Sequence, residues 1–285
     1  MNLTLSAHEI GSGLPVLIIH GWQMSAKVEQ FDFEPIFTKT SGLHRIYIDL
    51  PGMGTTPANN IRNLDDIYAS IVHFIDSRLQ NTKFLLVGSS CGGYLARALA
   101  QRYINQVDGL LLHVPLMEPD DRIRDLDPFA PVVSNAPLMA SLSSEDRDLL
   151  GNVLVQTPTY ITALKARILD VWLPAEKAAD KEVLDPIRAD PQRYRLSQSS
   201  LAVDNEAKFF APTLIVCGRQ DESVGYRDSL RLLERYPRST YIVLDRGTHG
   251  LPVDDNEAVV LEALVRDWIF RVDEWRGSSM GRQEL

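Results

Sequence analysis

The sequence has little cysteine, no excess of basic charge and no long apolar run. Two cysteines among 285 residues, Cys91 and Cys217, are too few for a disulfide framework or a cysteine-based zinc or iron–sulfur site. Acidic residues outnumber basic ones by 38 to 29, which argues against binding through general attraction to nucleic acid or anionic lipid. The chain lacks the run of about 18 apolar residues that a membrane helix needs. The first residues also lack the pattern of a secretory signal, so we expect a cytoplasmic protein.

Short apolar runs bounded by turn residues predict the strands. They lie at 14–20, 45–50, 84–88, 109–114, 213–217 and 241–244, with a weaker one at 3–10. Helices are predicted between them, at 63–79, 91–103, 223–236 and 256–275. In the last helix, Val260, Leu264, Trp268 and Val272 recur every four residues and predict its buried face. Continuous apolar runs are typical of strands buried on both faces, so the pattern predicts an α/β fold with a mostly parallel sheet flanked by helices.

The alternation of strands and helices stops between residues 116 and 205. This stretch contains only helical pieces, which we place at 136–142, 145–155, 160–173 and 175–187. An insertion that follows a strand's carboxyl end stands over the usual ligand crevice of such folds. We therefore expect a core made of 1–115 and 206–285 and a helical cap at 116–205. The alternative is a set of surface helices with no part in the chemistry.

One short motif carries the strongest chemical signal. The strand at 84–88 runs directly into Gly88-Ser89-Ser90-Cys91-Gly92, a G-x-S-x-G pattern followed by a helix. A strand that turns sharply into a helix lifts the central serine above the sheet, and the two glycines leave room for the turn. The same pattern recurs around Ser279, where no strand precedes it and no candidate base follows it. The context therefore selects Ser90 as the nucleophile.

A serine nucleophile needs a base, and the base needs an orienting carboxylate. Of the six histidines, His249 lies in a loop just past the last strand, on the edge of the sheet where Ser90 is expected. Asp221 follows the strand at 213–217, and we expect it to be the acid, with Glu118 as the alternative. His113, at another strand end, is expected to be mainly structural, with pocket lining as the lesser possibility.

Two backbone N–H groups are expected to hold the negative oxygen that forms during acyl transfer. The N–H of Cys91 stands at a helix N-terminus, which favours negative charge. The N–H of Trp22 follows the strand at 14–20 and is the simplest second donor. We expect the Cys91 side chain to be dispensable, because the residue supplies backbone rather than thiol chemistry.

These landmarks resemble those of the α/β-hydrolase superfamily along nearly the whole chain. The matching segments are His20–Trp22, Asp49–Gly54, Gly88–Gly93, Gly218–Asp221 and Gly247–His249. The chain order serine, aspartate, histidine is that of this superfamily. The resemblance implies an eight-stranded-type sheet with an inserted cap, and it is greatest to capped bacterial esterases, C–C bond hydrolases and cofactor-free haloperoxidase-like members. The sequence departs from the usual pattern at Ser89, where histidine is common, and at Cys91, where glutamine, methionine or tyrosine is common.

The sequence thus predicts a serine hydrolase that cleaves a small carboxylester, lactone or thioester, without metal or cofactor. Two alternatives stay open: a C–C bond hydrolase, and a ligand-binding protein with little or no catalytic activity. We expect a small-molecule substrate and no nucleic-acid or membrane partner; the oligomeric state is left open. Five apolar residues are candidates for the pocket wall: Phe31, Phe129, Met139, Tyr160 and Trp172.

Overall fold

The computed structural model describes residues 4–197 and 207–278. Seven strands in these residues form one sheet with the order β1-β3-β2-β4-β5-β6-β7. The strand β1 pairs antiparallel to β3, and the other neighbours are all parallel. The strands are β1 (Ala7–Gly11), β2 (Leu14–Ile19), β3 (Leu43–Ile48), β4 (Phe84–Ser89), β5 (Val107–His113), β6 (Thr213–Gly218) and β7 (Ser239–Leu244). The mostly parallel α/β sheet predicted from the sequence is confirmed, with seven strands described.

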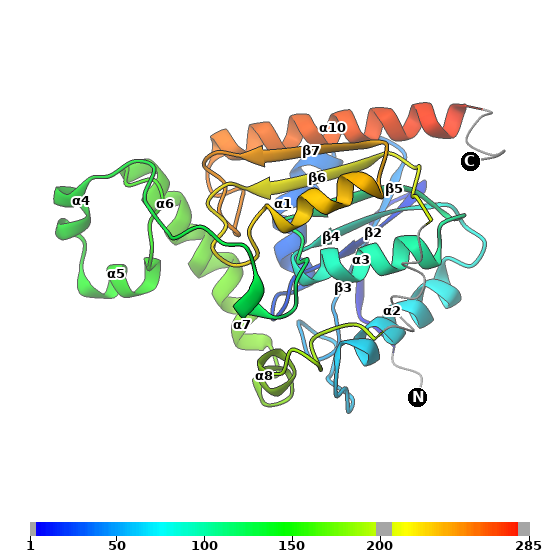
Figure 1. Ribbon diagram of the computed structural model, residues 1–285, viewed down its shortest axis with the longest axis horizontal. Helices are drawn as coiled ribbons and strands as arrows, with labels where there is room; N and C mark the ends of the chain where they lie inside the picture. Colours follow the sequence, from blue (N-terminus) through cyan, green and yellow to red (C-terminus); the bar gives the residue numbers. More distant parts are fainter. Residues whose placement is uncertain (1–3, 198–206, 279–285) are drawn as a thin grey trace.

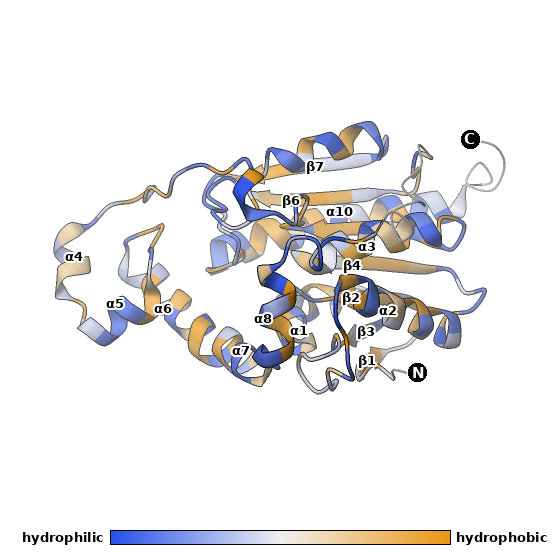
Figure 2. Ribbon diagram, turned by 60° about the horizontal axis from the view of Figure 1, so that its bottom comes forward, coloured by the Kyte–Doolittle hydropathy of each residue, from blue (hydrophilic) through white to orange (hydrophobic). Residues whose placement is uncertain are grey.

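Alternate residues of the central strands enter two separate apolar cores, one on each face of the sheet. In β2, Leu17 and Ile19 join the core formed with α2 (Leu64–Arg78) and α3 (Cys91–Arg102). Val16 and Ile18 join the core formed with α1 (Ala26–Phe37) and α10 (Asp255–Gly277). The central strand β4 accordingly stands out in orange, as an apolar strand, between helices of mixed colour (Figure 2). Burial on both faces explains why their sequences do not alternate between apolar and polar residues.

The segment between β5 and β6 contains helices and no strand in its described part. Its described helices are a 3-10 turn (Asp121–Ile123), α4 (Ala136–Ser141), α5 (Ser144–Leu150), α6 (Pro158–Arg167), a π-helical turn (Ile168–Trp172), α7 (Leu173–Ala178) and α8 (Lys181–Ala189). We call this segment the helical insertion. In Figure 1 its helices α4, α5 and α6 extend beyond the carboxyl ends of the strands, marked by the arrowheads. Its predicted end at residue 205 lies outside the described residues.

The structure corrects three local predictions. The sequence analysis missed α1, in which Pro35 interrupts the helical pattern in the last turn. The helix expected at 223–236 is a shorter 3-10 helix at Asp228–Glu234. In α10, Val260 is 43% exposed, and the buried stripe runs instead through Leu261, Val265, Trp268, Ile269 and Val272. That spacing of three and four residues follows the 3.6-residue period better than a strict repeat of four.

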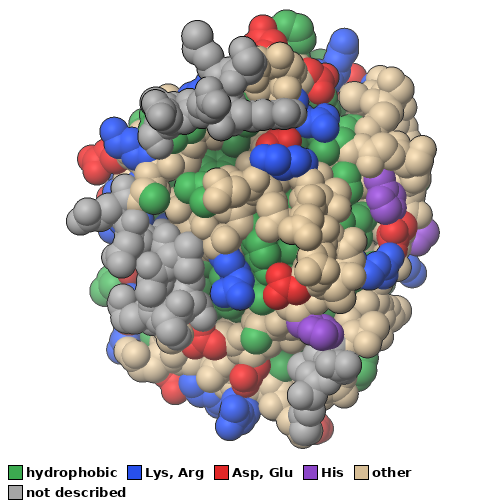
Figure 3. Space-filling view, turned by 90° about the vertical axis from the view of Figure 1, so that its right-hand side faces the viewer, with side chains coloured by type: hydrophobic (Ala, Val, Ile, Leu, Met, Phe, Trp, Pro, Cys, Tyr) green, Lys and Arg blue, Asp and Glu red, His purple; other side chains and the backbone are tan. Residues whose placement is uncertain are grey.

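The amino ends of the parallel strands lie at the end of the molecule opposite α4, α5 and α6 (Figure 1). Figure 3 shows this end, where acidic and basic side chains are interspersed over the visible surface. None of the helices within residues 4–197 and 207–278 has the length and apolar character that crossing a membrane requires.

Trp268 is the largest fully buried side chain in the core between α10 and the sheet, and its indole N–H donates to the carbonyl of Pro212 at 3.0 Å. We expect Trp268→Ala to lower the free energy of unfolding by about 3–5 kcal/mol, because it opens a large cavity and removes this hydrogen bond. Urea unfolding measures the change. Phe270→Ala is the matched control on the same helix: its side chain is 62% exposed, so a change within about 0.5 kcal/mol is expected. Equal losses in the two variants would contradict this placement of α10.

Candidate active site

Ser90 occupies the sharp turn between β4 and α3. Its backbone has φ 54° and ψ −119°, a left-handed conformation that residues other than glycine rarely adopt. The neighbouring backbone holds this turn, because the N–H of Ser90 donates to the carbonyl of His113 and the N–H of Leu116 donates to the carbonyl of Ser90. A side chain at Gly92 would collide with the backbone oxygen of Ile19. The start of α3 can therefore lie this close to β2 only because residue 92 is a glycine. The turn therefore fixes where the Ser90 hydroxyl points.

The structure brings Ser90, His249 and Asp221 together from three separate loops. His249 Nε2 lies 2.9 Å from Ser90 Oγ, and His249 Nδ1 lies 2.9 Å from Asp221 Oδ2. Because an ionised carboxylate only accepts hydrogen bonds, Nδ1 carries the proton and Nε2 is free to accept the Ser90 hydroxyl proton. The loops follow β4, β6 and β7, and the carboxyl ends of parallel strands share one edge of the sheet. All three predicted residues thus converge as the sequence analysis expected.

Asp221 is a buried carboxylate that its partners keep charged. Burial alone raises the pKa of this carboxyl group, but the charge and hydrogen bond of His249 and the N–H groups of Val224 and Ser223 outweigh burial and lower it. Both N–H groups donate to Oδ1 at 2.9 Å, while Oδ2 is left for His249. The carboxylate is therefore fixed in place and ready to stabilise a positive charge on the imidazole.

The two predicted oxyanion donors belong to segments that adjoin the serine. Cys91 is the first residue of α3, and no hydrogen bond from its N–H or from that of Trp22 is found within the described chain. The loop before Trp22 lies against the nucleophile: a Cβ on Gly21 would sit 3.2 Å from Ser90 Cβ. The buried ring of His20 holds this loop, since its Nδ1–H donates to the Gly21 carbonyl at 2.7 Å and its Nε2 accepts from the N–H of Leu50 at 3.0 Å.

The thiol of Cys91 is buried beneath this site. Burial raises its pKa to about 12, although the hydroxyl of Tyr194 and two arginines act in the opposite direction. At neutral pH the sulfur therefore stays protonated and is a poor nucleophile.

Comparison with known proteins identifies the family. The model of the alpha/beta hydrolase family matches residues 16–263. The chain belongs to the alpha/beta hydrolase family. It is 35% identical over 112 residues to a pimeloyl-[acyl-carrier protein] methyl ester esterase of Shewanella woodyi, a match that spans 39% of this chain and 40% of that enzyme. It is 24% identical over 278 residues, 95% of both chains, to a 2-hydroxy-6-oxo-2,4-heptadienoate hydrolase of Pseudomonas putida.

Among solved structures, an alpha/beta superfamily hydrolase from Oenococcus oeni superposes with a TM-score of 0.79. It is 24% identical, and the match covers 94% of this chain and 96% of that one. At this level of identity, the comparison shows a shared fold. The segment matched by the family model includes Trp22, Ser90, Cys91, Asp221 and His249.

Two cavities of this protein share His249 in their walls. The first, of about 360 Å³, is lined by Ser90, His249, Gly21 and Trp22 among others. The second, of about 230 Å³, is lined by His249 and by residues of the insertion, without Ser90. Trp172 lines both cavities.

The predicted pocket residues fall in three places. Phe129 and Tyr160 line the smaller cavity together with Trp172. Met139 packs against the apolar core of the helical insertion. The prediction for Phe31 is wrong, because its side chain is 54% exposed and lines an outer groove instead of the Ser90 cavity. Phe31 lies on the solvent face of α1, the helix that the sequence analysis missed.

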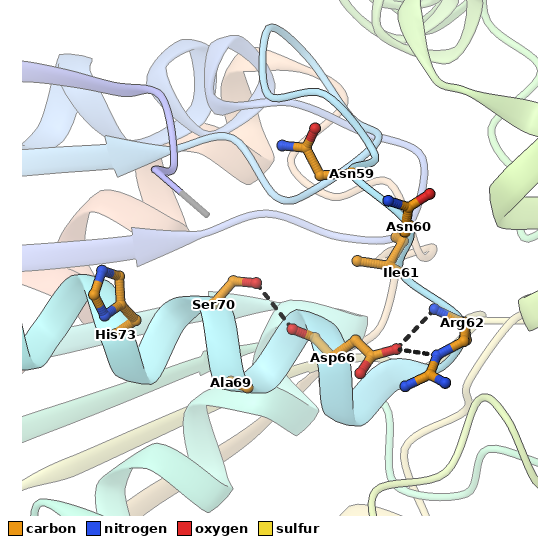
Figure 4. Close-up of a pocket in the computed structure, with 8 residues that line it drawn as sticks. All are labelled: Asn59, Asn60, Ile61, Arg62, Asp66, Ala69, Ser70 and His73. Carbon is orange, nitrogen blue, oxygen red and sulfur yellow. Dashed lines mark hydrogen bonds and ion pairs between the residues drawn. The ribbon is translucent and has the colours of Figure 1, made fainter. Parts of the chain in front are cut away.

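Other candidates lie away from the triad. Glu118, the alternative acid, pairs instead with Arg195. Ser279 lies outside the described residues. Within 4–197 and 207–278, no three histidine, cysteine or acidic side chains gather as a metal site. A hollow of about 410 Å³ over α2 is lined by eight residues and includes no member of the triad; its Ser70 and Asp66 are already hydrogen-bonded within the helix (Figure 4).

The cavity beside Ser90 is also lined by ionisable groups that the sequence analysis did not find. Glu29 and Asp32 come from α1 and Arg167 from α6, and all three are buried. Glu29 lies on the same buried face of α1 as Phe33 and Ile36. An acidic residue at a position that the helical period assigns to the buried face could therefore have indicated a buried carboxyl group. His113, considered above as a lesser candidate, lines the same cavity.

Glu29 should make stability depend on pH. Burial, reinforced by the nearby charge of Asp32, raises its pKa from 4.5 to about 8, against the opposing effects of Ser89 and Arg167. Between these values the folded protein keeps a proton that the unfolded chain releases. The contribution of Glu29 is therefore full below pH 4.5 and is lost as pH rises toward 8, by about 1.4 kcal/mol per pH unit.

Glu29→Gln removes this ionisation with little change in shape. We expect the unfolding free energy of the wild type, relative to that of Glu29→Gln, to fall steadily from pH 5 to pH 8. Urea unfolding of both proteins across that range measures the difference. Parallel pH profiles would show that Glu29 is ionised in the folded protein.

Proposed function

We propose that the protein is a serine hydrolase that cleaves small carboxylesters, lactones or thioesters through Ser90, His249 and Asp221. The observation that carries the proposal is the single imidazole that bridges the serine hydroxyl and the buried carboxylate at 2.9 Å on each side. This arrangement provides what a weakly nucleophilic hydroxyl needs: a base within reach, and an acid that orients the base.

In the proposed reaction, Ser90 Oγ attacks the substrate carbonyl while His249 Nε2 takes the hydroxyl proton. The backbone N–H groups of Trp22 and Cys91 stabilise the oxyanion, and Asp221 stabilises the imidazolium. His249 then gives its proton to the leaving group, and the acyl group stays on Ser90. A water molecule, deprotonated by His249, releases the acid and restores the serine.

The helical insertion, with boundaries 116–205, is proposed to act as a cap. It contributes Trp172 to the wall of the Ser90 cavity, together with Arg167 and Glu176. A side chain at Gly250, next to the base, would collide with the Trp172 ring, so the insertion packs closely against the histidine loop. Its helices share an apolar core that includes Val155, and Val253 from the segment before α10 packs into the same core.

A second candidate is a hydrolase that acts on a 2-hydroxy-6-oxo-dienoate, by cleaving a C–C bond. The match to the Pseudomonas putida hydrolase over 95% of both chains favours it. The same triad would serve, so only product analysis separates it from an esterase. A ligand-binding protein without activity is the alternative from another class.

Loss of a triad member should abolish hydrolysis. We expect Ser90→Ala and His249→Ala to lower kcat/KM for p-nitrophenyl acetate by roughly 10⁴- to 10⁶-fold, and Asp221→Asn by roughly 10⁴-fold, because the three residues act as a unit. A fluorophosphonate probe should label the wild type stoichiometrically, Ser90→Ala not at all and His249→Ala weakly. A folded wild type that takes up no probe would favour the ligand-binding alternative.

Cys91→Ala tests whether residue 91 contributes only its backbone. We expect this variant to keep most of its activity toward p-nitrophenyl acetate, because the substitution leaves the N–H in place and removes a buried, protonated thiol. Ser90→Ala serves as the inactive reference in the same assay. If Cys91→Ala is as inactive as Ser90→Ala, the thiol has a chemical role and the assignment is wrong.

A further inference from the structure

The loop that carries the proposed oxyanion donor Trp22 forms a tight turn with a strained residue in it. The N–H of Met24 donates to the carbonyl of Gly21 at 3.3 Å, so Trp22 and Gln23 are the two central residues of a four-residue turn. Gln23 has φ 56°, in the left-handed region. A positive φ at the third residue is typical of type II turns, where glycine is the usual residue. Glutamine at this position therefore needs support from its surroundings.

The turn fixes the direction of the Trp22 N–H through one peptide plane. The carbonyl of Gly21 and the N–H of Trp22 belong to the same planar trans peptide, so they point in opposite directions. That carbonyl accepts two hydrogen bonds, from the Nδ1–H of His20 at 2.7 Å and from the N–H of Met24. The bond from Met24 depends on the conformation of Gln23, because this residue lies between the two bonded groups. The orientation of the oxyanion donor therefore depends on residue 23.

Two contacts hold Gln23, and they come from different parts of the chain. Its N–H donates to the sulfur of Met53 at 3.2 Å, and Met53 is a fully buried side chain in the loop after β3. Its side-chain amide donates to Asp185 Oδ1 at 2.6 Å, and Asp185 belongs to α8 of the helical insertion. A thioether sulfur is a weak acceptor, whereas a carboxylate is a strong one. The contact with Asp185 is therefore the stronger of the two.

The helix α8 is itself fixed to the sheet domain, so it can serve as an anchor for the loop. Its Leu184 is fully buried in the apolar core that includes α2 and α3. The N–H of Asp180, the N-cap residue of α8, donates to the carbonyl of Gly52 at 2.8 Å. Just beyond the helix, the ring of Tyr194 lies 4.9 Å from that of Trp22 in an edge-to-face contact. The C-terminal part of the insertion thus contacts the oxyanion loop at a second place.

We propose that Gln23 is a positioning residue of the oxyanion hole and that Asp185 of the helical insertion holds it in place. The inference rests on the proposed function, since it concerns a donor that the same reaction uses. The hydrogen bond to Asp185 keeps Gln23 in the left-handed region, and the turn then presents the Trp22 N–H to the oxyanion. The insertion therefore supports the chemistry as well as the cavity wall, through a contact that spans 162 residues of sequence.

The alternative is that this contact only ties two surface segments together. Asp185 is exposed, and an exposed polar contact adds little to the stability of a fold. Without a role in the chemistry, its loss would change neither the unfolding transition nor kcat. A positioning role predicts a lower kcat with little change in KM or in unfolding, because hydrogen bonds to the oxyanion stabilise the transition state more than the bound substrate.

Two substitutions at position 23 separate the backbone from the side chain. Gln23→Ala removes the amide and leaves a residue that disfavours a positive φ, whereas Gln23→Gly removes more atoms but adopts the turn conformation freely. We expect Gln23→Ala to lower kcat for p-nitrophenyl acetate by roughly tenfold with KM within about twofold, which is less than the roughly 10²- to 10³-fold cost of losing a donor. Gln23→Gly should stay within about threefold of the wild-type kcat. A loss in Gln23→Gly as large as that in Gln23→Ala, or no loss in Gln23→Ala, overturns the inference.

Asp185→Ala tests the other partner of the contact. We expect it to lower kcat by roughly tenfold in the wild-type background and to add no further loss to Gln23→Ala, because both substitutions break the same contact. Glu182→Ala is the matched control, since it removes one exposed acidic side chain from the same helix and should leave kcat unchanged. Urea unfolding of each variant verifies that it is folded. Losses that multiply in the double variant, or an equal loss in Glu182→Ala, overturn the inference.

Trifluoroacetone reports on the oxyanion hole directly. Ser90 Oγ bonds to its carbonyl carbon, the hydroxyl proton moves to His249, and the ketone oxygen becomes an oxyanion like that of the proposed reaction. The inhibition constant should rise in Gln23→Ala and in Asp185→Ala by about the factor by which kcat/KM falls. An unchanged inhibition constant in variants whose kcat has fallen overturns the inference.

The same assays separate this inference from the proposed function. A wild type that hydrolyses p-nitrophenyl acetate and takes up the fluorophosphonate probe supports the function. If the variants at positions 23 and 185 then match this wild type, the inference is overturned and the function stands. A wild type that does neither overturns both.

Discussion

The left-handed backbone at Ser90 is the constraint on which the rest of the site depends. A serine held at φ 54° between a central strand and a helix presents its hydroxyl above the sheet edge, with the helix N-terminus directly behind it. Such a conformation costs about 1–3 kcal/mol and persists only where its surroundings enforce it. Here the backbone of β5 and the close approach of Gly92 to β2 do so. The loops after β6 and β7 lie at this same edge of the sheet, so they bring Asp221 and His249 within reach of the hydroxyl.

Two buried carboxyl groups near this edge have opposite protonation, and their partners explain the difference. Asp221 accepts two backbone N–H bonds and faces His249, so its pKa is lowered in spite of burial. Glu29 receives one hydroxyl hydrogen bond and lies near the negative Asp32, so its pKa is raised to about 8. Divergent environments of this kind typically assign different tasks to chemically similar groups. In the proposed function the charged acid supports the base, whereas the neutral acid lies in the wall of the Ser90 cavity.

The insertion and α1 together decide what surrounds the serine. A π-helical turn follows Arg167 directly and ends at Trp172, and such turns frequently occur at functional sites. Arg167 reaches from the insertion to Asp32 on α1, and this ion pair lines both the Ser90 cavity and the outer groove. Part of the wall of the Ser90 cavity is therefore held by a contact between segments 135 residues apart in the sequence.

The sequence alone determined the alternation of strands and helices, the G-x-S-x-G turn and the positions of Asp221 and His249. Each of these depends on local patterns: apolar runs, turn glycines and polar residues placed just after strand ends. Only the tertiary structure decided that Glu29, His113 and Arg167 share the cavity of Ser90, and that Phe31 does not. Their roles depend on which side chains from distant segments meet. No local pattern specifies these facts, because burial and partners are properties of the folded chain.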